Sequence, residues 1–144
     1  MYLFLKEFLS GRPAFFGALV YTYIPYKAVN VYVRGALNEF WTLAFYPLLF
    51  WSSWKIIKEG GRKNLAFFGI STALILITHN LMTLIFLPVL AVWILLNVIL
   101  EKNYRSLITI FLGGLLGIGM AAFFTLPVFL EKEYAHLETL VGGY

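Results

Sequence analysis

The stretch of sequence that decides the fold is Leu65–Leu100, which reads LAFFGISTALILITHNLMTLIFLPVLAVWILLNVIL. As a single helix it would be ~54 Å long, well beyond the ~30 Å hydrocarbon core of a bilayer. A turn is therefore needed, and Thr78-His79-Asn80 is the most polar point at which to place it. Asn80 suits this position because Asn tolerates the left-handed conformation that ends a helix. We predict two membrane helices here. Pro88 is a competing place for the break, or else a kink in the second helix.

The rest of the chain extends this pattern to an all-α, polytopic membrane bundle. Hydrophobic residues make up 61% and charged residues 12% of the 144 residues, against about 25% charged in a soluble domain. Lipid must therefore cover much of the surface. There is no cysteine, which excludes disulfides and thiolate metal sites. The four predicted spans are Glu39–Ile57, Leu65–Thr78, Leu81–Leu100 and Ser106–Leu126.

The N-terminal region does not contain a full span. Pro13–Ile24 is apolar but short, and three interpretations stay open: a half-span, a re-entrant piece or a juxtamembrane helix. Met1–Leu9 resembles the tail of an earlier span. We therefore expect residues 1–144 to form a single membrane domain that is part of a larger membrane protein, whose remaining helices would be its partners.

The basic residues predict an orientation. Eight of the eleven Lys and Arg residues lie on one side of the predicted spans: Lys6, Arg12, Lys55, Lys58, Arg62, Lys63, Lys102 and Arg105. The other side holds Lys27, Arg34 and Lys132. By the positive-inside rule the first group is cytoplasmic and the second faces outward. Because these bases flank apolar runs, we expect membrane lipid rather than nucleic acid as the partner.

Chemistry-bearing residues gather at the predicted outer ends, beginning with the segment Tyr23–Glu39. Arg34 carries a planar guanidinium suited to phosphate or carboxylate. Asn38 is predicted to cap the next helix and to leave Glu39 in its first turn, where a negative charge suits the helix dipole. Two interpretations stay open: an Arg34–Glu39 ion pair that closes the loop, or an anion and metal site. Tyr26 is a further candidate for contacting the substrate.

Two more candidates come from the other outer ends. His79 is either a hydrogen-bonded structural residue or, because the second span is short, a residue recessed in a cavity together with Asn80. Glu131 follows Pro127 and is either an acid of an outer loop or a second-tier member of the same cavity. Gly113, Gly117 and Ala121 repeat every four residues, which predicts close packing against another helix.

Three motifs in these regions resemble one family. They are Y-x-P-Y-x-x-x-N-x-Y-x-R-G-A-L-x-E-F-W (Tyr23–Trp41), L-I-L-I-T-H-N (Leu74–Asn80) and A-F-F-x-L-P-x-x-x-E (Ala122–Glu131). Through these three motifs, the chain resembles prokaryotic polytopic membrane proteins described as related to 6-pyruvoyl-tetrahydropterin synthase. The soluble synthase is a zinc enzyme, and this chain offers no equivalent of its histidine cluster. The membrane family is grouped with the GT-C glycosyltransferases, which use polyprenyl-phosphate-linked sugars at the outer membrane face.

The resemblance implies transfer of a sugar from a polyprenyl-phosphate donor to a cell-envelope acceptor. Arg34 would bind the donor phosphate, His79 and Asn80 would line the cavity, and Glu39 would be the candidate for catalysis or for holding a divalent metal. GT-C enzymes also use an acid in the first outer loop, and this chain has no aspartate. That acid would lie upstream of Met1; otherwise the chain is a non-catalytic subunit for lipid binding or transport.

Overall fold

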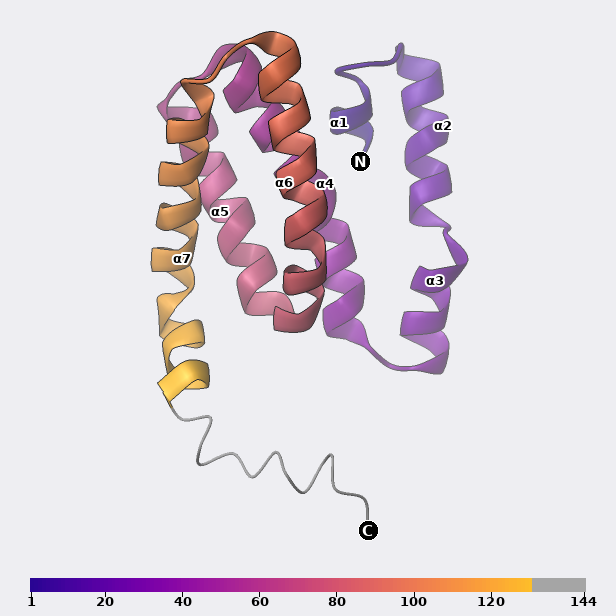
Figure 1. Ribbon diagram of the computed structural model, residues 1–144. Coiled ribbons are helices and arrows are strands. Elements are labelled where there is room, and N and C mark those ends of the chain that lie inside the picture. Colours follow the sequence, from indigo (N-terminus) through magenta and orange to yellow (C-terminus); the bar gives the residue numbers. More distant parts are fainter. Residues whose placement is uncertain (131–144) are drawn as a thin grey trace.

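A computed structural model describes residues 1–130, and every regular element in that range is a helix (Figure 1). The elements are α1 (Tyr2–Leu5), α2 (Gly11–Thr22), α3 (Pro25–Ala28), the π-helix η1 (Val29–Val33), α4 (Leu37–Glu59), α5 (Arg62–Thr78), α6 (Asn80–Glu101) and α7 (Ser106–Leu130). The all-α prediction is confirmed for these residues. Each of the four predicted spans corresponds to one of the long helices α4 to α7.

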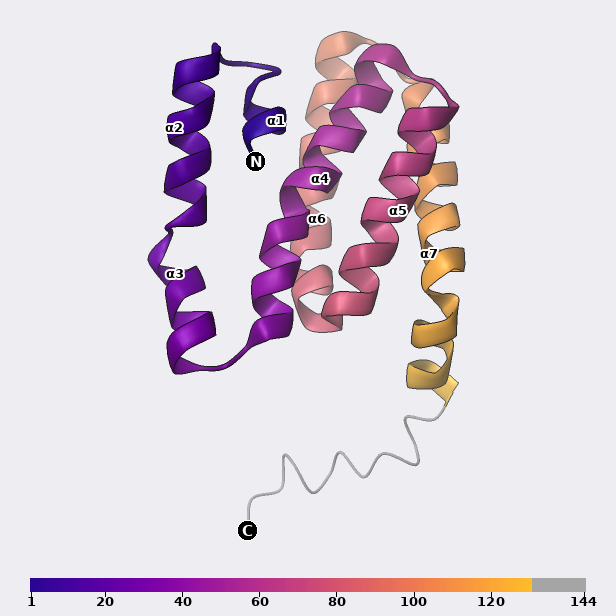
Figure 2. The ribbon, with the colours of Figure 1, turned by 180° about the vertical axis from the view of Figure 1, so that it is seen from behind.

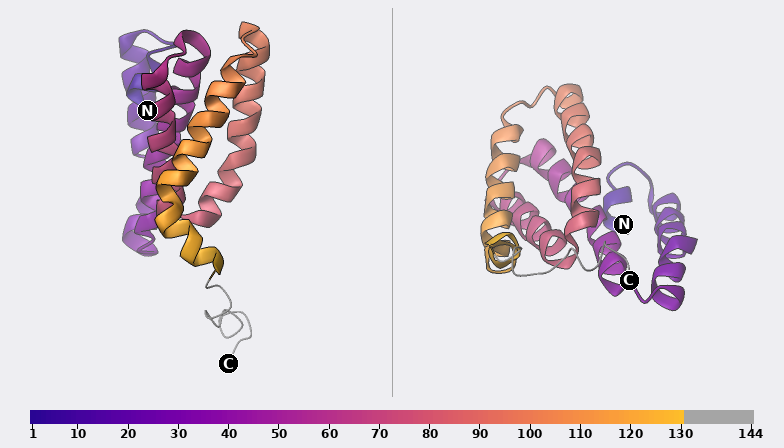
Figure 3. Two further views of the ribbon diagram at one scale, coloured as in Figure 1. Left: turned by 90° about the vertical axis from the view of Figure 1, so that its left-hand side faces the viewer. Right: turned by 60° about the horizontal axis from the view of Figure 1, so that its bottom comes forward.

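The long helices form a bundle, and the short N-terminal helices lie along one side of it (Figures 1 and 2). Helix α5 packs along both α4 and α7, while α6 packs against α4. Helices α2 and α7 lie at opposite sides of the molecule, as Figure 3 also shows. An apolar cluster lies between the long helices and consists of Leu49, Ile56, Ile57, Phe68, Ile75, Phe86, Leu90, Ile94, Val98 and Ile110.

The turn inside Leu65–Leu100 is at the predicted place but has a different cause. His79 is extended (φ −162°, ψ 108°) and interrupts the helix, whereas Asn80 is already the first residue of α6. The prediction that Asn80 would end a helix in the left-handed conformation is therefore wrong. Thr83 completes the turn, because its hydroxyl donates to the carbonyls of Ile75 (2.9 Å) and His79 (2.8 Å). Pro88 lies inside α6 without interrupting it.

The predicted small-residue stripe on α7 does pack closely against a helix, and that helix is α5. Gly113, Gly117 and Ala121 are all buried. A Cβ added at Gly117 would lie 2.5 Å from the Cβ of Thr72 and 2.6 Å from the carbonyl oxygen of Gly69. No side chain fits between two backbones at that separation. This is how membrane helices use small residues, because close backbone approach increases van der Waals contact.

The N-terminal region folds as an arm beside α4. The arm consists of α2, α3 and η1, residues 11–33, and α1 lies between α2 and α4 (Figures 1 and 2). The predicted short segment Pro13–Ile24 becomes the twelve-residue helix α2. Met1–Leu9 does not form one helix, since only Tyr2–Leu5 is helical before the chain turns into α2. Phe4 and Phe8 hold this piece against an aromatic cluster with Phe50 and Trp93.

The two ends of the molecule differ in charge as predicted. Figure 1 shows the connections α1–α2, α4–α5 and α6–α7 at one end, which we call the basic end. The turns η1–α4 and α5–α6 lie at the opposite end, which we call the polar end. At the basic end, ion pairs join Lys55 to Glu7 (3.1 Å) and Lys58 to Glu101 (2.7 Å). These pairs offset part of the charge that α4 carries there.

Within residues 1–130, two helices are long and apolar enough to cross a membrane, namely α6 and the part of α7 from Ser106 to Pro127. Both expose apolar side chains over most of their surface; examples on α6 are Leu84, Val92 and Leu96. A helix that is apolar on several sides fits a lipid environment. The structure thus agrees with a helical membrane protein. The two other predicted spans do not meet the same requirements, because α4 is less apolar than α6 and α7 and α5 has only 17 residues.

Candidate functional site

The polar end is shaped by an unusual piece of backbone. Pro25 is the first residue of α3, where its missing N–H costs no hydrogen bond. The chain then widens into η1, and the N–H of Arg34 donates to the carbonyl of Val29 (2.9 Å), five residues earlier. Such π-helical turns are rare and occur frequently at functional sites. Gly35 reverses the chain with φ +64°, a left-handed value that favours glycine.

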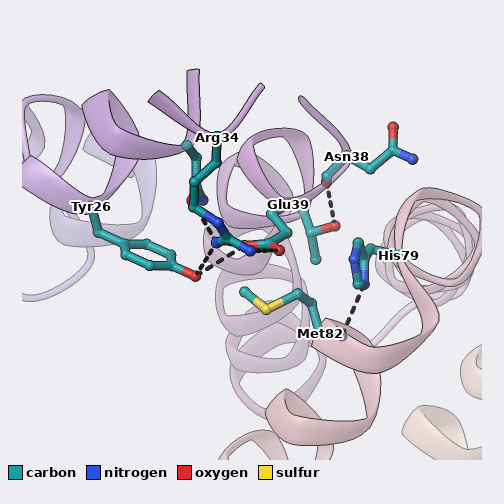
Figure 4. A network of polar contacts seen from close by, with 8 residues as sticks. Tyr26, Arg34, Asn38, Glu39, His79 and Met82 are labelled. Atoms are coloured by element: carbon teal, nitrogen blue, oxygen red, sulfur yellow. Dashed lines mark hydrogen bonds and ion pairs between the residues drawn. The ribbon is translucent and has the colours of Figure 1, made fainter. Parts of the chain in front are cut away.

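This reversal brings Arg34 and Glu39 face to face (Figure 4). The two terminal nitrogens of Arg34 donate to the two carboxylate oxygens of Glu39, each at 2.8 Å. The Tyr26 hydroxyl donates to the same carboxylate at 2.9 Å. Hydrogen bonding and charge from Glu39 raise the pKa of the Arg34 guanidinium above its ordinary value. The ion-pair interpretation is therefore the one that the structure shows.

Asn30 supports Arg34 from η1 and is a residue that the sequence analysis missed. Its side chain is fully buried, and its amide oxygen accepts from Arg34 at 3.0 Å. The amide nitrogen is also buried and has no hydrogen-bond partner within residues 1–130. A buried N–H donor without a hydrogen-bond partner lowers the stability of the folded protein. The available signal was its position four residues before Arg34, since side chains at that spacing meet on one helical face.

His79 lies across a cleft from this network. The cleft has a volume of about 410 Å³, and its lining consists of Gly35, Ala36, Leu37, Asn38, Glu39 and His79. The Nδ1 atom of His79 accepts a hydrogen bond from the N–H of Met82 (3.2 Å), as Figure 4 shows. His79 thus caps α6 and lines the cleft at once, so its two predicted roles do not exclude each other.

The remaining predictions have mixed outcomes. Glu39 is in the first turn of α4 as expected, but Ala36 and not Asn38 is the N-cap. The carbonyl of Asn38 accepts from the Thr42 hydroxyl instead (2.8 Å). Asn80 is exposed beside His79 and does not line the cleft. Glu131 lies outside the described residues, so its predicted place near the cavity stays a prediction.

The donor set around Glu39 does not fit a metal held by protein side chains. Both carboxylate oxygens already accept from Arg34. Within residues 1–130, no group of three or more His, Cys, Asp or Glu residues could hold a metal ion. What the site does offer is a guanidinium at the edge of an open cleft. Arg34 is 47% exposed in its side chain, so another anion can reach it.

The chain was compared with known proteins. No curated protein and no solved structure matches it. A family model does match, over residues 1–139, and its description is 6-pyruvoyl-tetrahydropterin synthase related domain; membrane protein. The match covers the arm, the cleft and all four long helices. The chain belongs to this family of membrane proteins, the 6-pyruvoyl-tetrahydropterin synthase related domain family.

Proposed function

We propose that the chain binds an anionic lipid of the polyprenyl-phosphate class at its polar end. The observation that carries this proposal is the bidentate Arg34–Glu39 pair at the edge of an open cleft. A phosphate presents two oxygens with nearly the same spacing as a carboxylate, and Arg binds both groups in the same forked geometry. An incoming phosphate would therefore compete with Glu39 for Arg34.

This exchange of partners gives Glu39 a role. When the phosphate takes over Arg34, the carboxylate is released beside His79, on the wall of the same cleft. In the sugar transfer implied by the GT-C resemblance, an acceptor hydroxyl oxygen bonds to the anomeric carbon of the sugar. The bond from that carbon to the lipid phosphate breaks, and the lipid phosphate leaves. Glu39 would take up the proton of the acceptor hydroxyl.

The proposal also fixes a membrane arrangement. We place the polar end at the outer face of a prokaryotic plasma membrane and the basic end in the cytoplasm, following the eight-to-three charge count. All four long helices would cross. Helix α5, at ~26 Å, is shorter than the hydrocarbon core, but α4 and α7 flank it. The charges of α4 lie near its ends, at Glu39 and at residues 55–59.

Labelling of introduced cysteines tests this orientation, because the parent chain has none. Gly61 lies in the basic α4–α5 connection and is exposed. In intact cells, Gly61→Cys should not react with an impermeant thiol reagent, and it should react once the membrane is opened. Reaction in intact cells would contradict the orientation.

A second candidate function is non-catalytic lipid binding or transport. It is favoured by the occupation of both Glu39 oxygens by Arg34, since a carboxylate held in this way is a poor base until it is released. The two candidates differ in the fate of the lipid. Membranes with the parent chain should consume a labelled polyprenyl-phosphate-linked sugar faster than membranes with Glu39→Gln if the chain is catalytic. Equal consumption would favour the non-catalytic candidate.

A titration of purified protein in nanodiscs with a polyprenyl phosphate tests the binding. Arg34→Lys should bind more weakly although the charge is kept, because the forked geometry is lost. Arg34→Ala should bind roughly tenfold or more weakly than the parent. Glu39→Gln should bind at least as well as the parent, because it frees Arg34. The matched control is Arg62→Ala, an exposed arginine at the basic end. Parent affinity in folded Arg34→Ala would overturn the proposal.

A further inference from the structure

Lys27, on the arm, is a buried cation. Its residue is only 8% exposed. Its Nζ atom takes part in no ion pair and no side-chain hydrogen bond within residues 1–130. The ion pairs in that range join other residues: Arg34 to Glu39, Lys55 to Glu7 and Glu59, and Lys58 to Glu101. Every other lysine in the described range is half-buried or exposed. Lys27 is therefore a lysine of residues 1–130 that is buried without an ion-pair partner.

An aromatic ring is the contact that Lys27 does make. Its Nζ atom lies 3.7 Å from the centroid of the Tyr21 ring. A cation over an aromatic face gains roughly 0.5–2 kcal/mol, which offsets part of the cost of removing an ammonium from water. The Tyr21 hydroxyl donates to the carbonyl of Leu43 and forms no hydrogen bond with Lys27. The ring positions the ammonium without neutralising it.

Lys27 also lines a pocket between the arm and the beginning of α4. The pocket has a volume of about 390 Å³, and its other lining residues are uncharged: Thr22, Tyr23, Ile24, Ala28, Val31, Tyr32, Leu37, Phe40 and Trp41. It shares only Leu37 with the cleft at Glu39 and His79. A single buried charge within apolar and aromatic walls is the usual composition of a ligand site.

The walls indicate what kind of ligand fits. Tyr23 and Tyr32 are 80% and 86% exposed, and Trp41 is 53% exposed. Tyrosine and tryptophan prefer the level of lipid headgroups in membrane proteins. A charged residue in a membrane protein that faces a cavity typically marks a substrate or ion site. The matching molecule has one anionic group for the ammonium and an apolar body for the walls.

We propose that Lys27 and the aromatic pocket around it bind the anionic headgroup of a membrane amphiphile, with a phosphate monoester as the simplest form. Nζ contacts the phosphate oxygens, and the apolar part lies along Tyr32, Leu37 and Trp41. The site is separate from the Arg34 cleft, so it stands without the function proposed above. It also requires no sugar transfer.

Lys27→Met tests this site. Met is close to Lys in length, and its thioether makes favourable contacts with an aromatic ring, so the packing on Tyr21 is kept. The matched control is Lys63→Met, which changes the net charge equally at an exposed position of the basic end. The probes are dodecyl phosphate, dodecanol and inorganic phosphate, each titrated against the 144-residue chain in phosphatidylcholine nanodiscs. Melting temperatures are measured with and without each probe.

The parent and Lys63→Met should bind dodecyl phosphate alike, and Lys27→Met should bind it roughly tenfold or more weakly. Without a probe, Lys27→Met should melt at the same temperature as the parent or higher, since the charge of a largely buried residue that forms no ion pair within residues 1–130 has been removed. Unchanged affinity together with a lowered melting temperature would make Lys27 a structural cation and overturn the proposal.

Two further results would overturn parts of the proposal. Inorganic phosphate binding as tightly as dodecyl phosphate would show an anion site that does not recognise an amphiphile. Arg34→Ala abolishing dodecyl phosphate binding while Lys27→Met retains it would place the headgroup in the Arg34 cleft. Weak binding of dodecanol by both the parent and Lys27→Met supports the assignment, because recognition then depends on the charge.

Discussion

The contact between α5 and α7 and the contact between the arm and α4 are built in opposite ways. At the first, backbones approach so closely that a Cβ at Gly117 would lie 2.6 Å from the carbonyl oxygen of Gly69. At the second, a pocket of about 390 Å³ remains. The Lys27 ammonium forms no ion pair within residues 1–130, and the buried amide nitrogen of Asn30 has no hydrogen-bond partner there. The first contact serves stability, whereas the second leaves space and polar groups without partners, where we propose that a ligand binds.

This difference shows where to look for function in a membrane protein made mostly of apolar residues. Lipid tails are as apolar as leucine, so helices gain little from hiding leucine from lipid. Close packing of small residues then holds the bundle together. Polar groups that stay buried and unpaired reduce stability, and such groups are typical of binding sites.

The largest expected effect on stability is at the close contact. Gly117→Ala should lower the free energy of unfolding by about 1–3 kcal/mol, because the added Cβ must push α5 and α7 apart. Gly119→Ala is the matched control, since a Cβ there meets nothing within 4 Å. Thermal unfolding in detergent measures both. Equal melting temperatures of the two variants would show that α5 and α7 pack less closely than described.

A smaller effect is expected at the contact between the arm and α4. Pro47 lies inside α4 and has no N–H, so the carbonyl of Leu43 lacks its usual helical donor. The Tyr21 hydroxyl donates to that carbonyl instead. Tyr21→Phe should therefore cost about 1 kcal/mol of stability. Tyr23→Phe, whose side chain is largely exposed, is the control and should cost nothing measurable.

A double-mutant cycle sharpens this second prediction. Pro47→Ala restores an N–H that can donate to Leu43 within α4. In that background Tyr21→Phe should cost clearly less than in the parent, because the carbonyl no longer depends on the arm. An unchanged cost in both backgrounds would mean that Tyr21 stabilises the arm by packing alone.

The fold was predictable from the sequence to the extent that hydrophobic patterning determines it. The length limit on a membrane helix predicted the turn at Thr78–Asn80, and the four-residue repeat of Gly113 and Gly117 predicted a close helix contact. The shape of the arm was not predictable, because a short apolar segment such as Pro13–Ile24 satisfies several arrangements equally. His79 caps α6 because its backbone is extended, and the amino-acid composition of the turn does not predict that conformation.

The sequence predicted which residues belong to the candidate site, but it did not predict which of them bind one another. Arg34, Glu39 and His79 were assigned to one end of the bundle because each lies at the end of a span. Whether Arg34 binds Glu39 or a ligand depends on the reversal at Gly35, which a residue list does not specify. Lys27 appeared in the sequence only as one of three bases on the outer side, since burial cannot be read from its neighbours.

The central claim is that the polar end and the adjoining arm recognise an anionic lipid headgroup. The most direct measurement compares geranylgeranyl phosphate with geranylgeraniol as ligands of the unmodified chain in phosphatidylcholine nanodiscs. These two lipids share the isoprenoid chain and differ only in the phosphate. The account predicts that the phosphate binds roughly tenfold or more tightly. Equal affinity for the two lipids would contradict it.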